Sequence, residues 1–84
     1  MMSEMIRAIS DAYNLSIDLY LIHNNIAHME MSDIDVTKNL SGDYSIGDAD
    51  GQELRFKSAA NVQFEDDEYA VDLGNGLTAY LYLH

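Results

Sequence analysis

Apolar residues recur at three- and four-residue spacing over the first thirteen positions of the chain. On a helix, one face would carry the side chains of Met5, Ile6, Ile9, Ala12 and Tyr13. Ser3 is a favourable N-terminal cap, and Glu4 places a negative charge in the first turn, where the helix dipole stabilises it. The pattern therefore predicts one short amphipathic helix over residues 3–13.

The period then changes to two. Every second residue from 15 to 21 is Leu or Ile, which is typical of a half-buried strand. A three-residue loop at 23–25 would pair this strand with the next one, because apolar side chains then face each other: Ile17 with Met31, Leu19 with Met29, and Leu21 with Ala27. The same register sets Asp18 opposite Glu30. A helix over residues 16–31 is the alternative, since His, Asn and Met are weak strand formers.

Residues 32–42 fit two interpretations. Ser32 or Asp33 could cap a short helix that ends near Gly42. Alternatively, Ile34 and Val36 belong to a strand.

The second half of the chain alternates more clearly. Short strands are expected around residues 44–46, 54–56 and 62–64, with glycine and asparagine in the turns between them. A loop of Gly74, Asn75 and Gly76 predicts a final hairpin. Its core side would pair Tyr69 with Leu81, Val71 with Ala79, and Leu73 with Leu77. Its other side would pair Glu68 with Tyr82, Ala70 with Tyr80, and Asp72 with Thr78.

These elements predict an α+β fold. We expect a single small domain over residues 1–84, with one short N-terminal helix packed on an antiparallel sheet of about four to seven short strands. The sheet face opposite the helix would then be open to solvent and available for binding.

Charge narrows the classes of partner. Fifteen Asp and Glu against four Lys and Arg give a net charge of −11, which disfavours nucleic acid and anionic membranes and favours a Lys/Arg-rich protein surface. The chain has no cysteine, and so neither a disulfide framework nor a thiolate metal site. No apolar run approaches the roughly 18 residues of a membrane span, and we expect a soluble, cytoplasmic protein.

Acidic residues recur two apart in several places, as in Asp33/Asp35, Asp48/Asp50, Glu65/Asp67 and Asp66/Glu68. On a strand, such side chains point the same way about 6.6 Å apart, so rows of them approximate the phosphates of a nucleic acid. The alternative is an ordinary solvated face. Tyrosines share the expected solvent-exposed face with acids: Tyr80 and Tyr82 with Glu68 and Asp72, and Tyr20 with Asp18 and Glu30. Phenol with carboxylate suits an Arg-rich partner. The candidate partner-binding residues are Asp18, Tyr20, Glu30, Glu65, Asp66, Asp67, Glu68, Asp72, Tyr80 and Tyr82.

Other chemistry finds little support. The segment from Asp48 to Glu53 resembles part of a calcium loop, but the EF-hand ligand spacing fails, and an Asp- and Gly-rich turn is favoured. His23, His28 and His84 lack the spacing of a zinc pair. No nucleophile elbow or phosphate-binding Gly-Lys-Ser/Thr motif is present. We therefore expect a non-enzymatic protein without metal or cofactor.

In size, acidity and lack of catalytic residues, the chain resembles the small inhibitors that phages and mobile elements encode against nucleic-acid-binding host defences, such as anti-CRISPR and anti-restriction proteins. The resemblance lies in composition and implies a DNA mimic that binds the basic surface of a complex such as a CRISPR effector. An acidic antitoxin or immunity protein of a nuclease is one alternative. A structural or accessory subunit that binds through an apolar sheet edge is another. Apart from these functions, the chain could form a homodimer.

Overall fold

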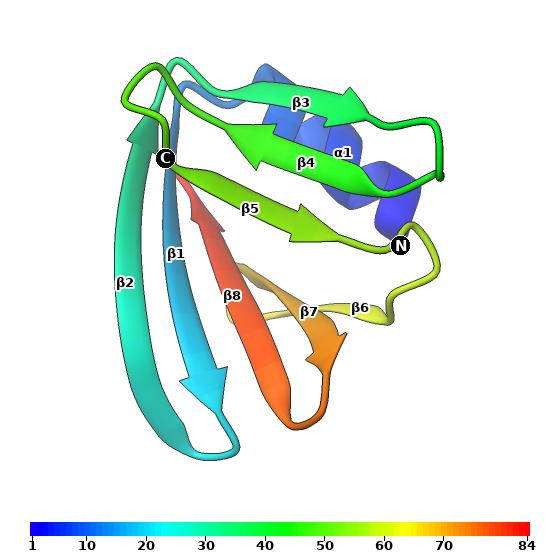
Figure 1. The fold of residues 1–84 in the computed structure, drawn as a ribbon. Coiled ribbons are helices and arrows are strands. Elements are labelled where there is room, and N and C mark those ends of the chain that lie inside the picture. Colours follow the sequence, from blue (N-terminus) through cyan, green and yellow to red (C-terminus); the bar gives the residue numbers. More distant parts are fainter.

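The structure, a computed structural model of residues 1–84, contains one helix and eight antiparallel strands (Figure 1). The elements are α1 (Met2–Asp11), β1 (Asn14–Leu21), β2 (Asn24–Ser32), β3 (Asp35–Lys38), β4 (Tyr44–Gly47), β5 (Glu53–Phe56), β6 (Val62–Glu65), β7 (Glu68–Gly74) and β8 (Leu77–Leu83). A five-stranded sheet has the order β2-β1-β8-β7-β6, and a three-stranded sheet has the order β3-β4-β5. The α+β prediction is confirmed, with two sheets in place of one. No helix is long and apolar enough to cross a membrane.

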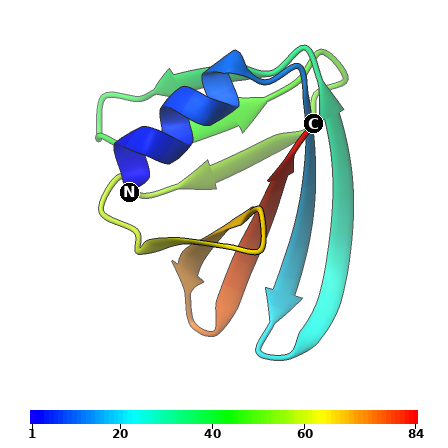
Figure 2. The same cartoon turned by 180° about the vertical axis from the view of Figure 1, so that it is seen from behind.

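The helix forms close to its predicted position and buries the predicted face. Met5 and Ile9 are fully buried, whereas Tyr13 lies beyond the helix and is exposed. Ser3 does not cap the helix as expected, because α1 begins one residue earlier, with Met1 as its N-cap. The helix lies across the three-stranded sheet, which is plain from behind (Figure 2).

The first hairpin has a different register from the predicted one. Ile22 and His23 form a two-residue turn, and the register shifts by one residue between Leu19 and Tyr20, which leaves Ile26 without a partner. Asp18 therefore lies opposite His28, not Glu30. The pairing is displaced by two residues, so the same side chains still face the core. The helix alternative for residues 16–31 is wrong.

The remaining strands follow the alternation of the sequence. Residues 35–38 form β3, so the helical interpretation of this region is wrong. In the final hairpin the predicted pairs hold from Glu68 to Asp72, but Leu77 pairs with Gly74 and not with Leu73. A bulge beside Asp72 accounts for this difference, because it shortens the loop to Asn75 and Gly76.

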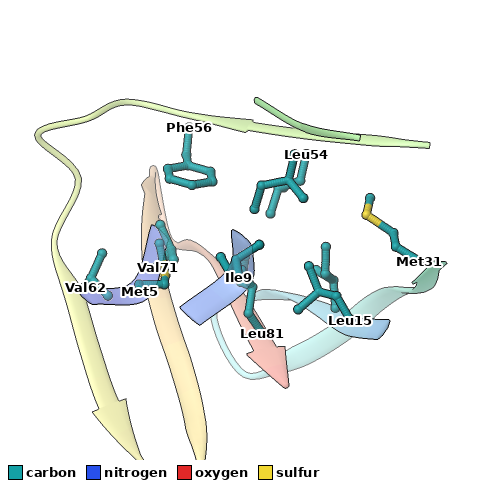
Figure 3. Close-up of a cluster of buried hydrophobic side chains, with 12 residues drawn as sticks. Met5, Ile9, Leu15, Met31, Leu54, Phe56, Val62, Val71 and Leu81 are labelled. Atoms are coloured by element: carbon teal, nitrogen blue, oxygen red, sulfur yellow. The ribbon is translucent and has the colours of Figure 1, made fainter. Parts of the chain in front are cut away.

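The core lies between the two sheets and the helix. Figure 3 shows Leu54 and Phe56 of β5 above the side chains of Leu15, Leu81 and Val71. The twelve buried side chains are all apolar: Met5, Ile9, Leu15, Ile17, Met31, Ile46, Leu54, Phe56, Val62, Val71, Ala79 and Leu81. No buried polar group competes with them.

The turn between β4 and β5 links the two sheets. The Asp48 carboxylate accepts hydrogen bonds from the backbone N–H groups of Asp50 (3.0 Å) and Gln52 (2.9 Å) and from the Gln52 side chain (2.8 Å). Burial alone would raise the pKa of Asp48, but these hydrogen bonds outweigh it and lower the pKa. The Gln52 amide also donates to the backbone carbonyl of Glu30 on β2 (2.8 Å). The expected Asp- and Gly-rich turn is confirmed.

Because one small core stabilises the whole fold, truncating a single core side chain should measurably lower the free energy of unfolding. We expect Leu81→Ala, which truncates a fully buried side chain, to lower the free energy of unfolding by about 2–5 kcal/mol. A core of this size supplies about 3–5 kcal/mol in total. A urea titration should therefore show that the variant is already largely unfolded at little or no urea. The control Leu40→Ala removes a fully exposed side chain and should change stability by less than about 0.5 kcal/mol.

Candidate functional site

The outer face, defined as the side of the five-stranded sheet turned away from the core, consists of three cross-strand rows. The first row contains Glu30, Ser16, Tyr82, Glu68 and Glu65. The second contains His28, Asp18, Tyr80, Ala70 and Gln63. The third contains Asn25, Tyr20, Thr78 and Asp72. Alternation along each strand places these side chains together, because their neighbours must fill the core.

Lys and Arg are absent from this sheet. Arg7 lies in α1, Lys38 in β3 and Arg55 in β5, while Lys57 follows β5. Arg55 forms an ion pair with Glu53 (3.0 Å), its neighbour on the same strand. The five carboxylates of the outer face therefore have no Lys or Arg among them. All four Lys and Arg residues lie outside the five-stranded sheet.

On the outer face, a histidine is the cationic partner of two carboxylates. His28 Nδ1 lies 2.7 Å from Asp18 Oδ1, and His28 Nε2 lies 2.8 Å from Glu30 Oε1. The hydrogen bonds to Asp18 and then to Glu30 raise the pKa of His28. Hydrogen bonds from Ser16 (2.7 Å) and then from His28 lower the pKa of Glu30. The predicted pairing of Asp18 with Glu30 was wrong: Asp18 lies opposite His28, and the imidazole bridges the two carboxylates.

Ser16 and His84 lie close together beside this cluster. The Ser16 hydroxyl donates to Glu30, so its 2.6 Å contact with His84 Nε2 requires the imidazole to be the donor. An activated serine has the reverse arrangement, in which the imidazole accepts the hydroxyl proton. In this arrangement the contact does not create a nucleophile.

Tyr80 stands near the centre of the outer face. Its ring meets Tyr20 edge to face, with centroids 5.3 Å apart. A hollow of about 120 Å³ on one side of it is bounded by Asp18, Tyr20 and Glu68. A second hollow of about 160 Å³, on the side of β6, is lined by Gln63, Glu65, Asp66, Glu68, Ala70 and Tyr80. Ala70 is the small residue of its row, and it leaves room beside the tyrosine ring.

The turn between β6 and β7 concentrates negative charge. Glu65 lies directly opposite Glu68, and Asp66 and Asp67 both have positive φ (54° and 63°). Like charges opposite each other destabilise a strand pair, and a two-residue turn of this conformation prefers Asn-Gly. No hydrogen bond or ion pair holds the four carboxylates of this acidic turn, residues 65–68. Sequence and geometry thus both work against stability here.

All ten residues expected to bind a partner lie on the outer face or on the adjoining acidic turn. Asp33, Asp35, Asp48 and Asp50, which show the same spacing, lie elsewhere. The sequence reasoning missed His28 as the partner of two carboxylates, and it missed Ser16 and His84. The two-residue spacing of His28 and Glu30 on one strand was a usable signal for the first of these.

Two further features bear on ligand chemistry. The largest cleft, of about 650 Å³, lies between β5 and the β7–β8 turn and is lined by Arg55, Lys57, Asp43 and Asp72 among others. It mixes both charges and lies apart from the centre of the outer face. No group of three or more His, Asp or Glu side chains is arranged to hold a metal ion.

Comparison with known proteins gave no similarity: no protein-family model, no curated protein and no solved structure matches this chain. The geometry and electrostatics of the outer face are therefore the basis for assigning a function.

The His28 cluster should make stability depend on pH. A raised pKa of His28 adds stability that is complete below its ordinary value of 6.5 and is lost as pH rises through the folded value. A lowered pKa of Glu30 adds stability that is present above 4.5 and is lost as pH falls through its folded value. Wild type should therefore gain stability from about pH 8 to about pH 6, measured by urea denaturation.

His28→Gln should remove this part of the gain. His23→Gln is the matched control, because His23 lies in an exposed turn with no hydrogen-bonded side chain, and it should behave as wild type. If His28→Gln has the same pH dependence as wild type, the imidazole does not stabilise the cluster.

Proposed function

We propose that this chain is a non-enzymatic inhibitor that binds the Lys/Arg-rich, nucleic-acid-binding surface of a partner protein. The observation that carries the proposal is the segregation of charge. Five carboxylates lie on the outer face, and the acidic turn adds two more, whereas none of the four Lys and Arg residues lies on that sheet. An ordinary solvated surface mixes both signs. This face would repel nucleic acid and attract the protein surface that binds it.

The spacing of the acids suits such a partner. Neighbouring strands lie about 4.8 Å apart and alternate residues on one strand about 6.6 Å apart, so the rows present carboxylates as an array in two directions. An arginine from the partner can bind a carboxylate through two parallel hydrogen bonds. The hollows beside Tyr80 place carboxylates next to a tyrosine ring, where a guanidinium also gains a cation–π contact.

The acidic turn supports the same proposal because its sequence and its charges destabilise the fold. Unfavourable backbone conformations and unrelieved repulsion persist where another requirement outweighs their cost. A cationic partner would relieve the repulsion between Glu65 and Glu68, which nothing in the chain relieves. We therefore place the centre of binding on β6, β7 and β8, and treat the part near His28 as already compensated.

Long-range attraction would speed association, and the tyrosines would hold the complex. In this mechanism the chain competes with DNA or RNA by occupying its site, and it needs no cofactor. The proposed setting is the cytoplasm of a host, with the chain acting as an anti-CRISPR or related anti-defence protein. An immunity protein that blocks a basic nuclease would use the same face, and the identity of the captured partner separates the two.

The decisive experiment reverses two charges on the outer face. We expect Glu68→Lys with Asp72→Lys to weaken binding to the partner captured from host lysate by at least tenfold, about 1.4 kcal/mol. Association rates should fall steeply from about 50 to about 500 mM salt for wild type and less for the variant. Biolayer interferometry would measure both, with competition by the partner's nucleic acid as a second readout.

Glu4→Lys with Asp11→Lys is the matched control. It makes the same change in net charge on exposed positions of α1 and should bind nearly as wild type. If both variants bind as wild type does, or if the wild-type rate is insensitive to salt, the outer face is not the binding surface. An accessory subunit that binds through apolar contacts would then be favoured.

The acidic turn allows a test in which stability and binding move in opposite directions. Asp66→Asn with Asp67→Gly gives the turn its preferred residues and removes two like charges. We expect the free energy of unfolding to rise by about 1 kcal/mol, while affinity for the partner falls. Equal affinity would mean that the acidic turn lies outside the interface. Lower stability would mean that the turn is not strained.

A further inference from the structure

Strand β2 forms a long open edge of the five-stranded sheet. It has nine residues and pairs on one side only, with β1, whereas the opposite edge, β6, has four residues. Both ribbon views show no segment along the outer side of β2 (Figures 1 and 2). Edges of this kind are usually protected by Lys, Pro, a β-bulge or a covering segment. β2 contains neither Lys nor Pro, and its one bulge lies at Ile26.

One hydrogen bond tells which backbone groups point outward. The Glu30 carbonyl accepts from the Gln52 side chain (2.8 Å) and therefore faces away from β1. In an antiparallel strand, the N–H and C=O of one residue point the same way and every second residue repeats the direction. The backbone groups of His28 consequently face outward as well. Gln52 covers the end of the edge at Glu30, and the regular part of the strand between Glu30 and the bulge at Ile26, residues 27–29, is left open.

The two faces along this edge differ in chemistry. On the outer face, the side chains at the edge are His28 and Glu30, with Asp18 directly behind His28. On the inner face they are Met31, which belongs to the buried core, Met29, which packs against it, and Ala27, which lies opposite Leu19. An added strand would therefore meet two carboxylates bridged by one imidazole on the outer side, and apolar groups on the inner side.

We propose that the β2 edge pairs with an extended segment of the partner in which basic and apolar residues alternate. That the partner is positively charged rests on the proposed function. The new element is that part of this charge lies on an extended segment, which pairs with β2 as an added strand. Backbone hydrogen bonds to the open edge would supply affinity, and the alternate side chains would supply specificity.

A second copy of the chain fits this edge less well. It would bring another net charge of −11 to the edge, and its own β2 offers no Lys or Arg to Glu30 or Asp18. Charge complementarity favours a basic segment over self-pairing.

Nuclear magnetic resonance with a defined peptide tests the proposal without knowledge of the partner. The probe is an acetylated, amidated twelve-residue peptide of alternating Arg and Val, with an alternating Glu and Val peptide as its control. We expect the Arg/Val peptide alone to slow amide exchange of His28 at least tenfold, with cross-strand nuclear Overhauser contacts to β2.

Three results would overturn the proposal. One is unchanged exchange at His28 while the amides around Tyr80 and Glu68 shift, which means binding on the outer face without strand pairing and leaves the proposed function intact. Another is no binding of the peptide. The third is protection of His28 without peptide in a dimer detected by sedimentation, which assigns the edge to a second copy.

A pair of variants separates the backbone from the side chain. His28→Ala and His28→Pro both remove the imidazole, but only the proline removes the outward N–H, and edge positions of this kind tolerate proline. His28→Ala should still bind the peptide and His28→Pro should bind at least tenfold more weakly. If His28→Pro is unfolded by circular dichroism, the exchange and contacts in wild type decide alone. Glu68→Lys with Asp72→Lys should keep the strand pairing, so failure of the outer face and failure of the edge are distinguishable.

Discussion

The alternation of side chains along five adjacent strands is the constraint on which the rest of the structure depends. Residues such as Ile17, Val71 and Leu81 are fully buried, and a slip of one residue in any strand would exchange them for the polar side chains between them. Both hairpins that contain a bulge keep their core residues, such as Ile17, Met31 and Val71, inside. The composition of the outer face is therefore fixed by the core, and its acids cannot move without unfolding the sheet.

Because of this constraint, the small core must hold many carboxylates together on one face, and their repulsion opposes the stability that the core supplies. On the side of β1 and β2 the chain relieves the repulsion itself, through His28 and Ser16. On the side of β6 and β7 it does not, and Glu65 and Glu68 face each other without a counter-charge. The outer face therefore has a compensated half and an uncompensated half. The second half has the most to gain from a positive partner.

Sequence patterns foretold the two faces of the sheet but not every neighbour across it. The register of the final hairpin followed from glycine and asparagine in its loop. The register of the first hairpin did not, because a shift by two residues leaves the apolar pattern unchanged and a bulge at Ile26 has no signature in the alternation. For that reason the sequence did not predict the contact of His28 with Asp18. The division into two sheets depends on contacts between distant segments, which periodicity within a segment cannot show.

The chain contains two acidic turns, and their carboxylates differ in what they do for the fold. The turn at Asp48 uses its carboxylate to hold its own backbone, and a glycine, Gly51, occupies the position of positive φ (88°). The turn at Asp66 and Asp67 has positive φ at both aspartates, and its carboxylates hold nothing. Turn geometry explains the acid in the first case and argues against the acids in the second. A requirement outside the folded chain is the simplest reason for them to be there.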